Sequence, residues 1–100
     1  MKVVFTEGAR QDLLAIGDYI ARDNPLRALS FTDELEDRCM SLERFPNAYP
    51  ILARRLQSNI RRMVHGNYSI FYSVLSDTVS IIHVLNGAMD YEKILFPEES

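Results

Sequence analysis

Apolar positions in the first quarter of the chain recur at helical spacing. One series has intervals of four, three and four residues, and its members are Ala9, Leu13, Ile16 and Ile20. This period places a single apolar stripe on an amphipathic helix, which Leu14 and Tyr19 are expected to widen. The preceding residues, Lys2 to Phe5, are short and rich in β-branched and aromatic side chains, which predicts a strand. Thr6 is placed to cap the helix that follows.

A second apolar series has intervals of three, four, four and three residues, and comprises Ala28, Phe31, Leu35, Cys39 and Leu42. Asn24 is a good N-cap for this helix, and Pro25 suits the first helical position because its missing N–H would be unpaired there. The helix is expected to run to about Arg44, since Phe45-Pro46 stops it. The link between the two helices is so short that they must fold back as a helical hairpin.

Three strand-like runs follow an irregular stretch at 47–58. They are Ile60–Val64, Tyr68–Leu75 and Val79–Leu85, and the segments between them are short enough for hairpins. A short helix or tail, Met89–Phe96, closes the chain. The order β-α-α-β-β-β predicts an α+β fold, in which the helical hairpin packs on one face of a mainly antiparallel, twisted sheet.

Length and composition narrow the class of protein. One hundred residues, 47% of them apolar and 25% charged, fit one globular domain over 1–100. Cys39 is the only cysteine, so an intrachain disulfide and a cysteine zinc cluster are excluded. The net charge of −3 gives no global positive field to hold nucleic acid. No run resembles a membrane span or a signal peptide, so we expect a cytoplasmic protein without membrane contact.

Two adjacent arginines lie near the start of the predicted strand Ile60–Val64. Arg61 and Arg62 point to opposite faces of a strand, so they cannot clamp one ligand together. The ordinary interpretation is a pair of solvated or helix-capping arginines. The functional interpretation groups them with Arg54 and Arg55 in a patch that binds an anion or a partner.

Histidines and tyrosines are the other candidates for chemistry. Histidine is the side-chain type best suited to proton transfer near neutral pH, but no motif ties His65 or His83 to a nucleophile or a carboxylate, so structural roles are expected. Tyr68 and Tyr72 alternate on one strand while Phe71 faces away from them. This pattern favours a half-buried core face over base stacking.

Acidic residues of the second helix do not suggest a metal site. Glu34 and Asp37 lie three apart on one side of the helix, and without a histidine partner they are expected to form a solvated face. No glycine-rich loop that could cradle a phosphate occurs in the sequence. We therefore expect no cofactor and no metal.

Short segments spread over nearly the whole chain together resemble the RelE/ParE superfamily of toxins from bacterial toxin–antitoxin pairs. Their order and spacing look more like the ParE branch than the RelE branch. The segments are Asp18-Tyr19-Ile20-Ala21, Asn24-Pro25 with Ala28 and Phe31, Leu42-Glu43-Arg44-Phe45-Pro46, Ile60-Arg61-Arg62, Tyr68-Ser69-Ile70-Phe71-Tyr72 and Ile81-Ile82-His83-Val84-Leu85-Asn86-Gly87.

The two branches imply different functions. RelE-type members cleave messenger RNA on the ribosome, and RelE-like toxins supply strand lysines and arginines, an arginine after the last strand and a tyrosine in the tail. Aligned on Asn67-Tyr68-Ser69, only Arg62 keeps a cation here, while the other positions hold Ser69, Met89 and Leu95. These side chains cannot supply the acid, base and cations that such cleavage needs.

The resemblance therefore implies a ParE-type toxin that inhibits DNA gyrase by binding, has no catalytic residue, and is neutralised by a cognate antitoxin. The alternatives are a ribosome-dependent RNase and an inactive toxin-fold partner. The second is motivated by Met89, which stands where ParE members commonly have arginine, whereas the aspartate that follows is kept as Asp90. Direct sequence-specific nucleic-acid binding is not expected, and a homodimer or a heterotetramer with the antitoxin is left open. The residues expected to contact the antitoxin or the target are Arg54, Arg55, Arg61, Arg62, Met89, Asp90 and Tyr91.

Overall fold

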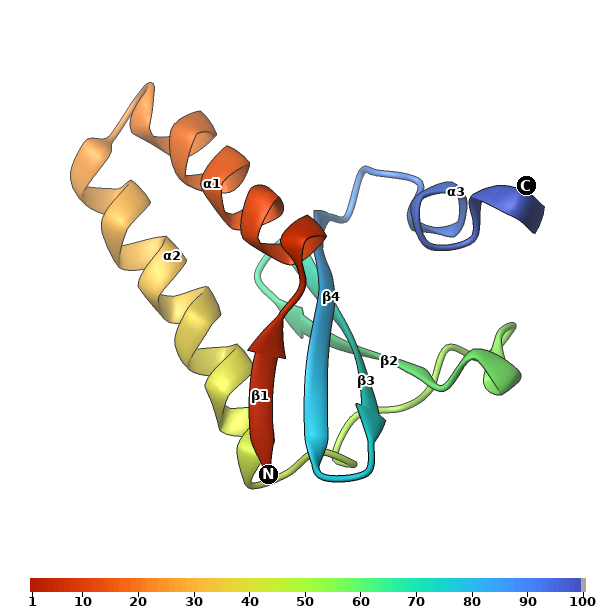
Figure 1. The fold of residues 1–100 in the computed structure, drawn as a ribbon. Coiled ribbons are helices and arrows are strands. Elements are labelled where there is room, and N and C mark those ends of the chain that lie inside the picture. The colour runs from red at the N-terminus through yellow and green to blue at the C-terminus, as the bar shows by residue number, and fades with distance from the viewer. Residues whose placement is uncertain (100) are drawn as a thin grey trace.

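Two antiparallel helices cover one face of a four-stranded sheet in the computed structural model, which describes residues 1–99 (Figure 1). This arrangement confirms the predicted α+β fold. Short 3₁₀ helices lie in the connections at Ser41–Glu43 and Leu56–Ser58, and a further one, Pro97–Glu99, follows the last α-helix. The main elements are β1 (Lys2–Phe5), α1 (Glu7–Ala21), α2 (Pro25–Met40), β2 (Ile60–His65), β3 (Tyr68–Leu75), β4 (Thr78–Asn86) and α3 (Tyr91–Leu95).

The sheet has the order β1-β4-β3-β2 and is mainly antiparallel, as predicted. Only the β1–β4 pair is parallel, and it ends where Phe5 lies opposite Ile81. The register between β3 and β4 shifts after Phe71. Phe71 lies opposite His83, but the next residue of β3, Tyr72, lies opposite Ile81. Ile82 is therefore an extra residue in β4, and such a bulge bends and twists a strand locally.

Side-chain caps begin both long helices where the sequence predicts them. The Thr6 hydroxyl accepts the Ala9 N–H at 3.1 Å and donates to the Ile82 carbonyl at 2.9 Å, which ties the start of α1 to β4. Asn24 accepts the Arg27 N–H at 3.0 Å at the start of α2. The end of α2 is earlier than predicted, because the chain tightens into a 3₁₀ turn after Met40.

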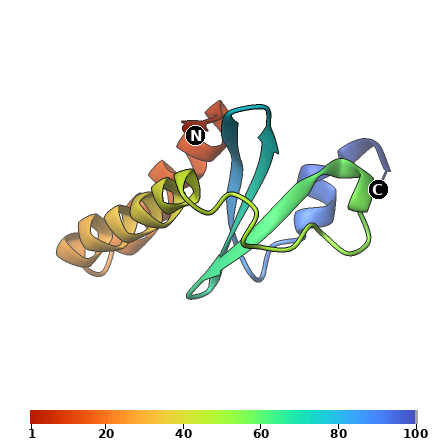
Figure 2. The same cartoon turned by 90° about the horizontal axis from the view of Figure 1, so that it is seen from below.

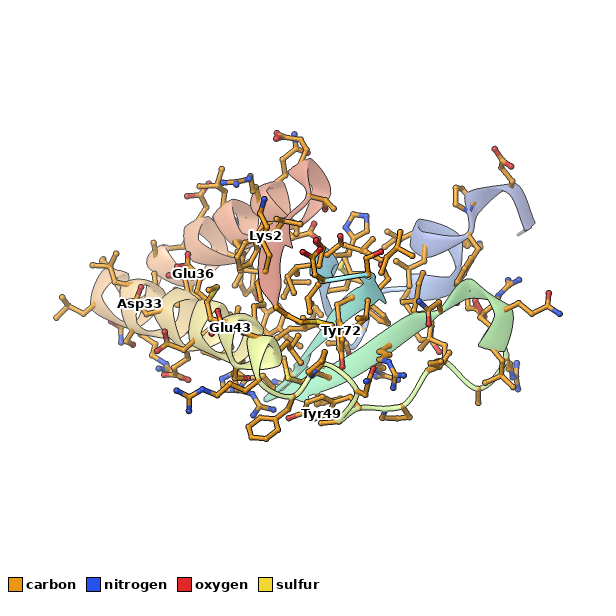
Figure 3. The ribbon with its side chains drawn as sticks, turned by 60° about the horizontal axis from the view of Figure 1, so that its bottom comes forward. Lys2, Asp33, Glu36, Glu43, Tyr49 and Tyr72 are labelled. Atoms are coloured by element: carbon orange, nitrogen blue, oxygen red, sulfur yellow. The ribbon has the colours of Figure 1, made fainter. Side chains whose placement is uncertain are left out.

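The main core lies between the helical hairpin and the sheet. Tyr72 is fully buried there and its hydroxyl donates to the Pro46 carbonyl at 2.9 Å, so the core interpretation of this tyrosine is confirmed. Figure 3 shows Tyr72 among the side chains beside α2, with Tyr49 on the loop that follows α2. Burial raises the pKa of the Cys39 thiol to about 12, which keeps it protonated and unreactive. Other fully buried members include Leu35, Leu42, Met63, Ile70 and Ile81.

A smaller core lies on the opposite face of the sheet, which we call the open face. Leu52, Phe71 and Leu85 are buried in it, and the C-terminal segment covers them through Tyr91, Ile94, Leu95 and Phe96. Figure 2 shows α3 on the side of the sheet away from α1 and α2. Within residues 1–99, no helix has the length and apolar character needed to cross a membrane.

Candidate functional site

Arg61 and Arg62 separate to opposite faces of β2, as their positions in the sequence predict. Arg61 shares its face with the buried Met63, and its Nη1 donates to the Tyr49 carbonyl at 2.6 Å. Its guanidinium therefore secures the loop that follows α2. The structure does not bring Arg61 together with the other arginines of the predicted patch.

Arg62 lies on the open face and contacts the C-terminal segment. Its Nε donates to the Ser69 hydroxyl at 2.9 Å, and its guanidinium carbon lies 5.4 Å from the centroid of the Tyr91 ring. The Tyr91 ring in turn lies 5.1 Å from the ring of Phe71. This stack of a cation and two rings places Tyr91 over the middle of the sheet.

A second arginine holds the same segment from the loop before β2. The Nε of Arg55 lies 3.2 Å from a Glu92 carboxylate oxygen, and its guanidinium carbon lies 4.3 Å from the centroid of the Phe96 ring. The neighbouring Arg54 is exposed and borders a hollow of about 600 Å³ formed by 53–58 and Phe96. Arg54 and Arg55 therefore lie near the C-terminal segment, as Arg62 does.

The C-terminal residues of the predicted site meet Arg62 around a second hollow, of about 160 Å³. Met89 is 48% exposed at its edge, and the Asp90 carboxylate caps α3 by accepting the Lys93 N–H at 3.4 Å. We call Met89, Asp90 and Tyr91 the C-terminal rim. The hollow joins this rim to Arg62, so four of the seven predicted site residues form one continuous surface.

An aspartate–histidine pair that no sequence motif indicates lies at the edge of the open face. His83 Nδ1 lies 2.7 Å from an Asp12 carboxylate oxygen, and the same oxygen accepts the Val84 N–H at 2.9 Å. Asp12 thus reaches β4 just beyond the point where β1 stops pairing with it. The two residues are 71 positions apart, so no local motif could have revealed the pair.

His83 also lies in a row that crosses the open face. It faces Phe71 on β3, and Phe71 faces Arg62 on β2. An imidazole, a tyrosine ring and a guanidinium therefore occupy one face of the sheet. The small hollow beside Arg62 is lined by Tyr91 but not by His83.

The expectation that Glu34 lacks a histidine partner is wrong. His65 Nε2 lies 3.1 Å from one Glu34 oxygen, and Arg27 Nη1 forms an ion pair with the other. The hydrogen bond from Arg27, and after it the one from His65, lowers the pKa of Glu34. No cluster of three or more metal-binding side chains occurs within residues 1–99, which leaves this group as an ion-pair network between α2 and the end of β2.

An apolar groove of about 910 Å³ runs along the helical hairpin. Leu14 and Tyr19, which are expected to widen the apolar stripe of α1, do not add to its buried face, because they are 70% and 64% exposed. Leu14 instead lines the groove with Leu29 of α2, which is 67% exposed. Small residues (Gly17, Ala21 and Ala28) also line the groove, and charged residues of mainly acidic character border it: Glu7, Arg10, Asp18 and Glu36. Figure 3 labels Glu36 on α2.

Comparison with known families assigns the chain to a class. Residues 3–91 match the family described as ParE toxin of type II toxin-antitoxin system, parDE. The chain therefore belongs to the ParE toxin family, and this membership implies an antitoxin partner. The resemblance inferred from the sequence segments is confirmed.

The fold agrees with a solved structure of this class. A chain from the structure titled "Chromosomal ParDE TA system from P. aeruginosa" superposes with a TM-score of 0.73. The match covers 86% of this chain and 95% of that chain at 19% sequence identity, so it supports the fold alone. A search of the curated proteins returned no match.

Proposed function

We propose that this ParE-family toxin inhibits DNA gyrase by binding and is neutralised by its antitoxin. The observation that carries the proposal is which side chains stand at the three positions that hold catalytic groups in RelE-like toxins, and what those side chains contact. Ser69 is 4% exposed and accepts the Arg62 hydrogen bond, Leu95 packs in the open-face core, and Met89 is an exposed thioether. None of these side chains is an acid or base that titrates near neutral pH, and none carries a positive charge to balance a phosphorane.

The C-terminal rim with Arg62 is the proposed surface for gyrase. It combines an exposed apolar side chain, a guanidinium and an aromatic ring around one small hollow. Arginine and tyrosine, together with methionine, are enriched at the centres of protein interfaces. A binding mechanism needs such a surface and no proton transfer.

The groove on the helical hairpin is the proposed surface for the antitoxin. Its apolar lining with small residues suits an amphipathic helix laid between α1 and α2. The acidic residues at its border favour basic residues beside the apolar face of that helix. This location differs from the expected arginine contacts, because Arg55 and Arg62 lie at the open face and Arg61 is bonded to the loop after α2.

A supercoiling assay tests the proposed target. The purified chain is expected to stop gyrase from supercoiling plasmid and to leave cleaved DNA, while Arg62→Gln and Met89→Glu each weaken inhibition by roughly ten-fold. Arg44→Gln is the matched control, since Arg44 is exposed and lies outside the rim and its hollow. Normal supercoiling and normal growth on expression without antitoxin would instead support the inactive partner.

One observation favours the RNase alternative. His83, fixed by Asp12, lies on the same sheet face as Arg62 and Tyr91, which are groups that RNA cleavage can use. The purified chain added to a translating extract separates the two functions. Messenger cleavage that His83→Gln abolishes, with gyrase supercoiling intact, would overturn the gyrase proposal.

A further inference from the structure

The C-terminal segment is held on the open face by side chains that also suit an external partner. Arg55 pairs with Glu92 and stacks on Phe96, and Arg62 stacks on Tyr91. The pattern held on this face is therefore a carboxylate with one aromatic residue directly before it and another four residues after it. Both arginines are positioned by the fold, one on β2 and one on the loop that precedes it.

The covering segment is the weaker half of this interface. The residues beneath it are deeply buried, with Phe71 at 0% and Leu85 at 3% exposure, whereas the covering side chains are only partly buried. Helix α3 has five residues, and so short a helix is not stable without the surface it packs on. Local release of 91–96 therefore costs less free energy than unfolding the sheet.

We infer that the open face beneath α3 is a docking surface for a segment of the toxin's target, and that this segment carries a carboxylate flanked by aromatic side chains. In the free chain, Tyr91–Phe96 occupies the surface as an internal ligand. The target segment replaces it on binding. This inference rests on the proposed function. Charge complementarity with Arg54, Arg55 and Arg62 sets the acidic character of the partner segment. A helix in the groove of the hairpin has the opposite requirement, because acidic residues border that groove.

Tethering keeps the surface covered in the free chain. The loop from Gly87 to Asp90 is short, so the effective concentration of the internal ligand is about millimolar. A target segment must supply better contacts than the tethered one. Release of 91–96 moves Tyr91 away from Arg62, so the hollow of the C-terminal rim belongs to the covered state, while Arg62, Met89 and Asp90 stay at the surface that the target contacts.

Two variants that break one ion pair from its two sides test the inference. Glu92→Gln and Arg55→Gln both weaken the hold on α3, and amide exchange at 91–96 is expected to rise roughly two- to five-fold in each. Gyrase affinity should change in opposite directions: it rises in Glu92→Gln, because the internal competitor is weaker, and falls roughly ten-fold in Arg55→Gln, because the partner carboxylate loses its guanidinium. Glu98→Gln is the matched control and leaves both quantities unchanged. A change of affinity in the same direction in both variants, or in neither, overturns the inference.

A peptide arm keeps the inference testable if gyrase is not the target. The probe is a synthetic peptide of residues 89–99 of this chain, added at millimolar concentration to isotope-labelled full-length protein. It is expected to shift the amide resonances of β2 and β3 in the Glu92→Gln chain and to leave those of Arg55→Gln unchanged. Shifts in both variants, or in neither, show that the face does not select the carboxylate. Peptide selection with no gyrase binding by any variant refutes the proposed target but not the surface.

Discussion

The two faces of the sheet are covered in very different ways. Helices α1 and α2, with 15 and 16 residues, cover one face over a continuous set of fully buried side chains. The five-residue α3 covers the open face over a core of three buried residues. Buried apolar area is the main source of stability, so the helical face stabilises the fold while the open face can exchange its cover.

The polar side chains on the two faces of the sheet also differ in what they contact. On the helical face, Tyr72 and Arg61 bond to backbone carbonyls, which belong to the fold itself. On the open face, Arg55 and Arg62 contact a carboxylate and aromatic rings, which another protein can also supply. The comparison indicates that permanent contacts and replaceable contacts lie on opposite sides of one sheet.

The largest effect is expected from truncation of the helical-face core. Leu35 is fully buried, so Leu35→Ala should lower the free energy of unfolding by about 3 kcal/mol. Leu95→Ala, in the partly buried cover of the open face, should cost about 1 kcal/mol or less. Urea denaturation measures both values. Equal losses in the two variants would contradict the division between the faces.

A charge in the apolar groove should separate partner binding from stability. Leu29 is 67% exposed, so Leu29→Glu should leave the free energy of unfolding within about 0.5 kcal/mol of the original value. It should weaken binding of the cognate antitoxin by roughly ten-fold or more, because it places a carboxylate against the apolar helix face proposed to occupy the groove. Isothermal titration measures the affinity. Leu75→Glu, at a 76% exposed site on β3, is the control that should bind normally.

Two glycines of α1 should respond to the same substitution with opposite signs. A Cβ on Gly8 would lie 2.9 Å from the His83 ring, which Asp12 holds in place, so Gly8→Ala should destabilise the protein by about 1 kcal/mol. At Gly17 the nearest atom would be a Thr32 methyl at 3.5 Å, an ordinary contact. Gly17→Ala should therefore stabilise by up to about 1 kcal/mol through helix propensity. Thermal unfolding of both variants checks the signs.

The smallest effect concerns the pH dependence of the Glu34 network. Arg27 and then His65 lower the pKa of Glu34 in the folded state, so its contribution to stability is present above the ordinary value of 4.5 and is lost as the pH falls through the lower folded value. Glu34→Gln should reduce the melting temperature slightly at pH 6, and the difference should shrink progressively as the pH falls below 4.5. Glu36→Gln, on the same helix, is the control. A difference that does not change with pH would assign the effect to packing instead.

Much of the fold could be predicted because its signals are local. Capping chemistry gives the positions at which the two long helices begin, beside Thr6 and Asn24. Periodicity gives the order of the elements and places Arg61 and Arg62 on opposite faces of their strand. The Asp12–His83 and Glu34–His65 pairs could not be predicted, since each joins residues more than 30 positions apart. The exposure of Leu14 could not be predicted, because periodicity defines an apolar stripe but not how much of it a neighbouring element covers.

By itself, the sequence determined the class of fold, the positions of its elements and the ParE-type family, because caps, periods and motif order are properties of neighbouring residues. Only the tertiary structure decided which arginines hold the C-terminal segment, where the apolar groove lies and what shares the open face with Arg62. The physical reason is that pairing across a sheet and packing between layers depend on the register and relative placement of distant elements, and the local chemistry of a segment does not specify them.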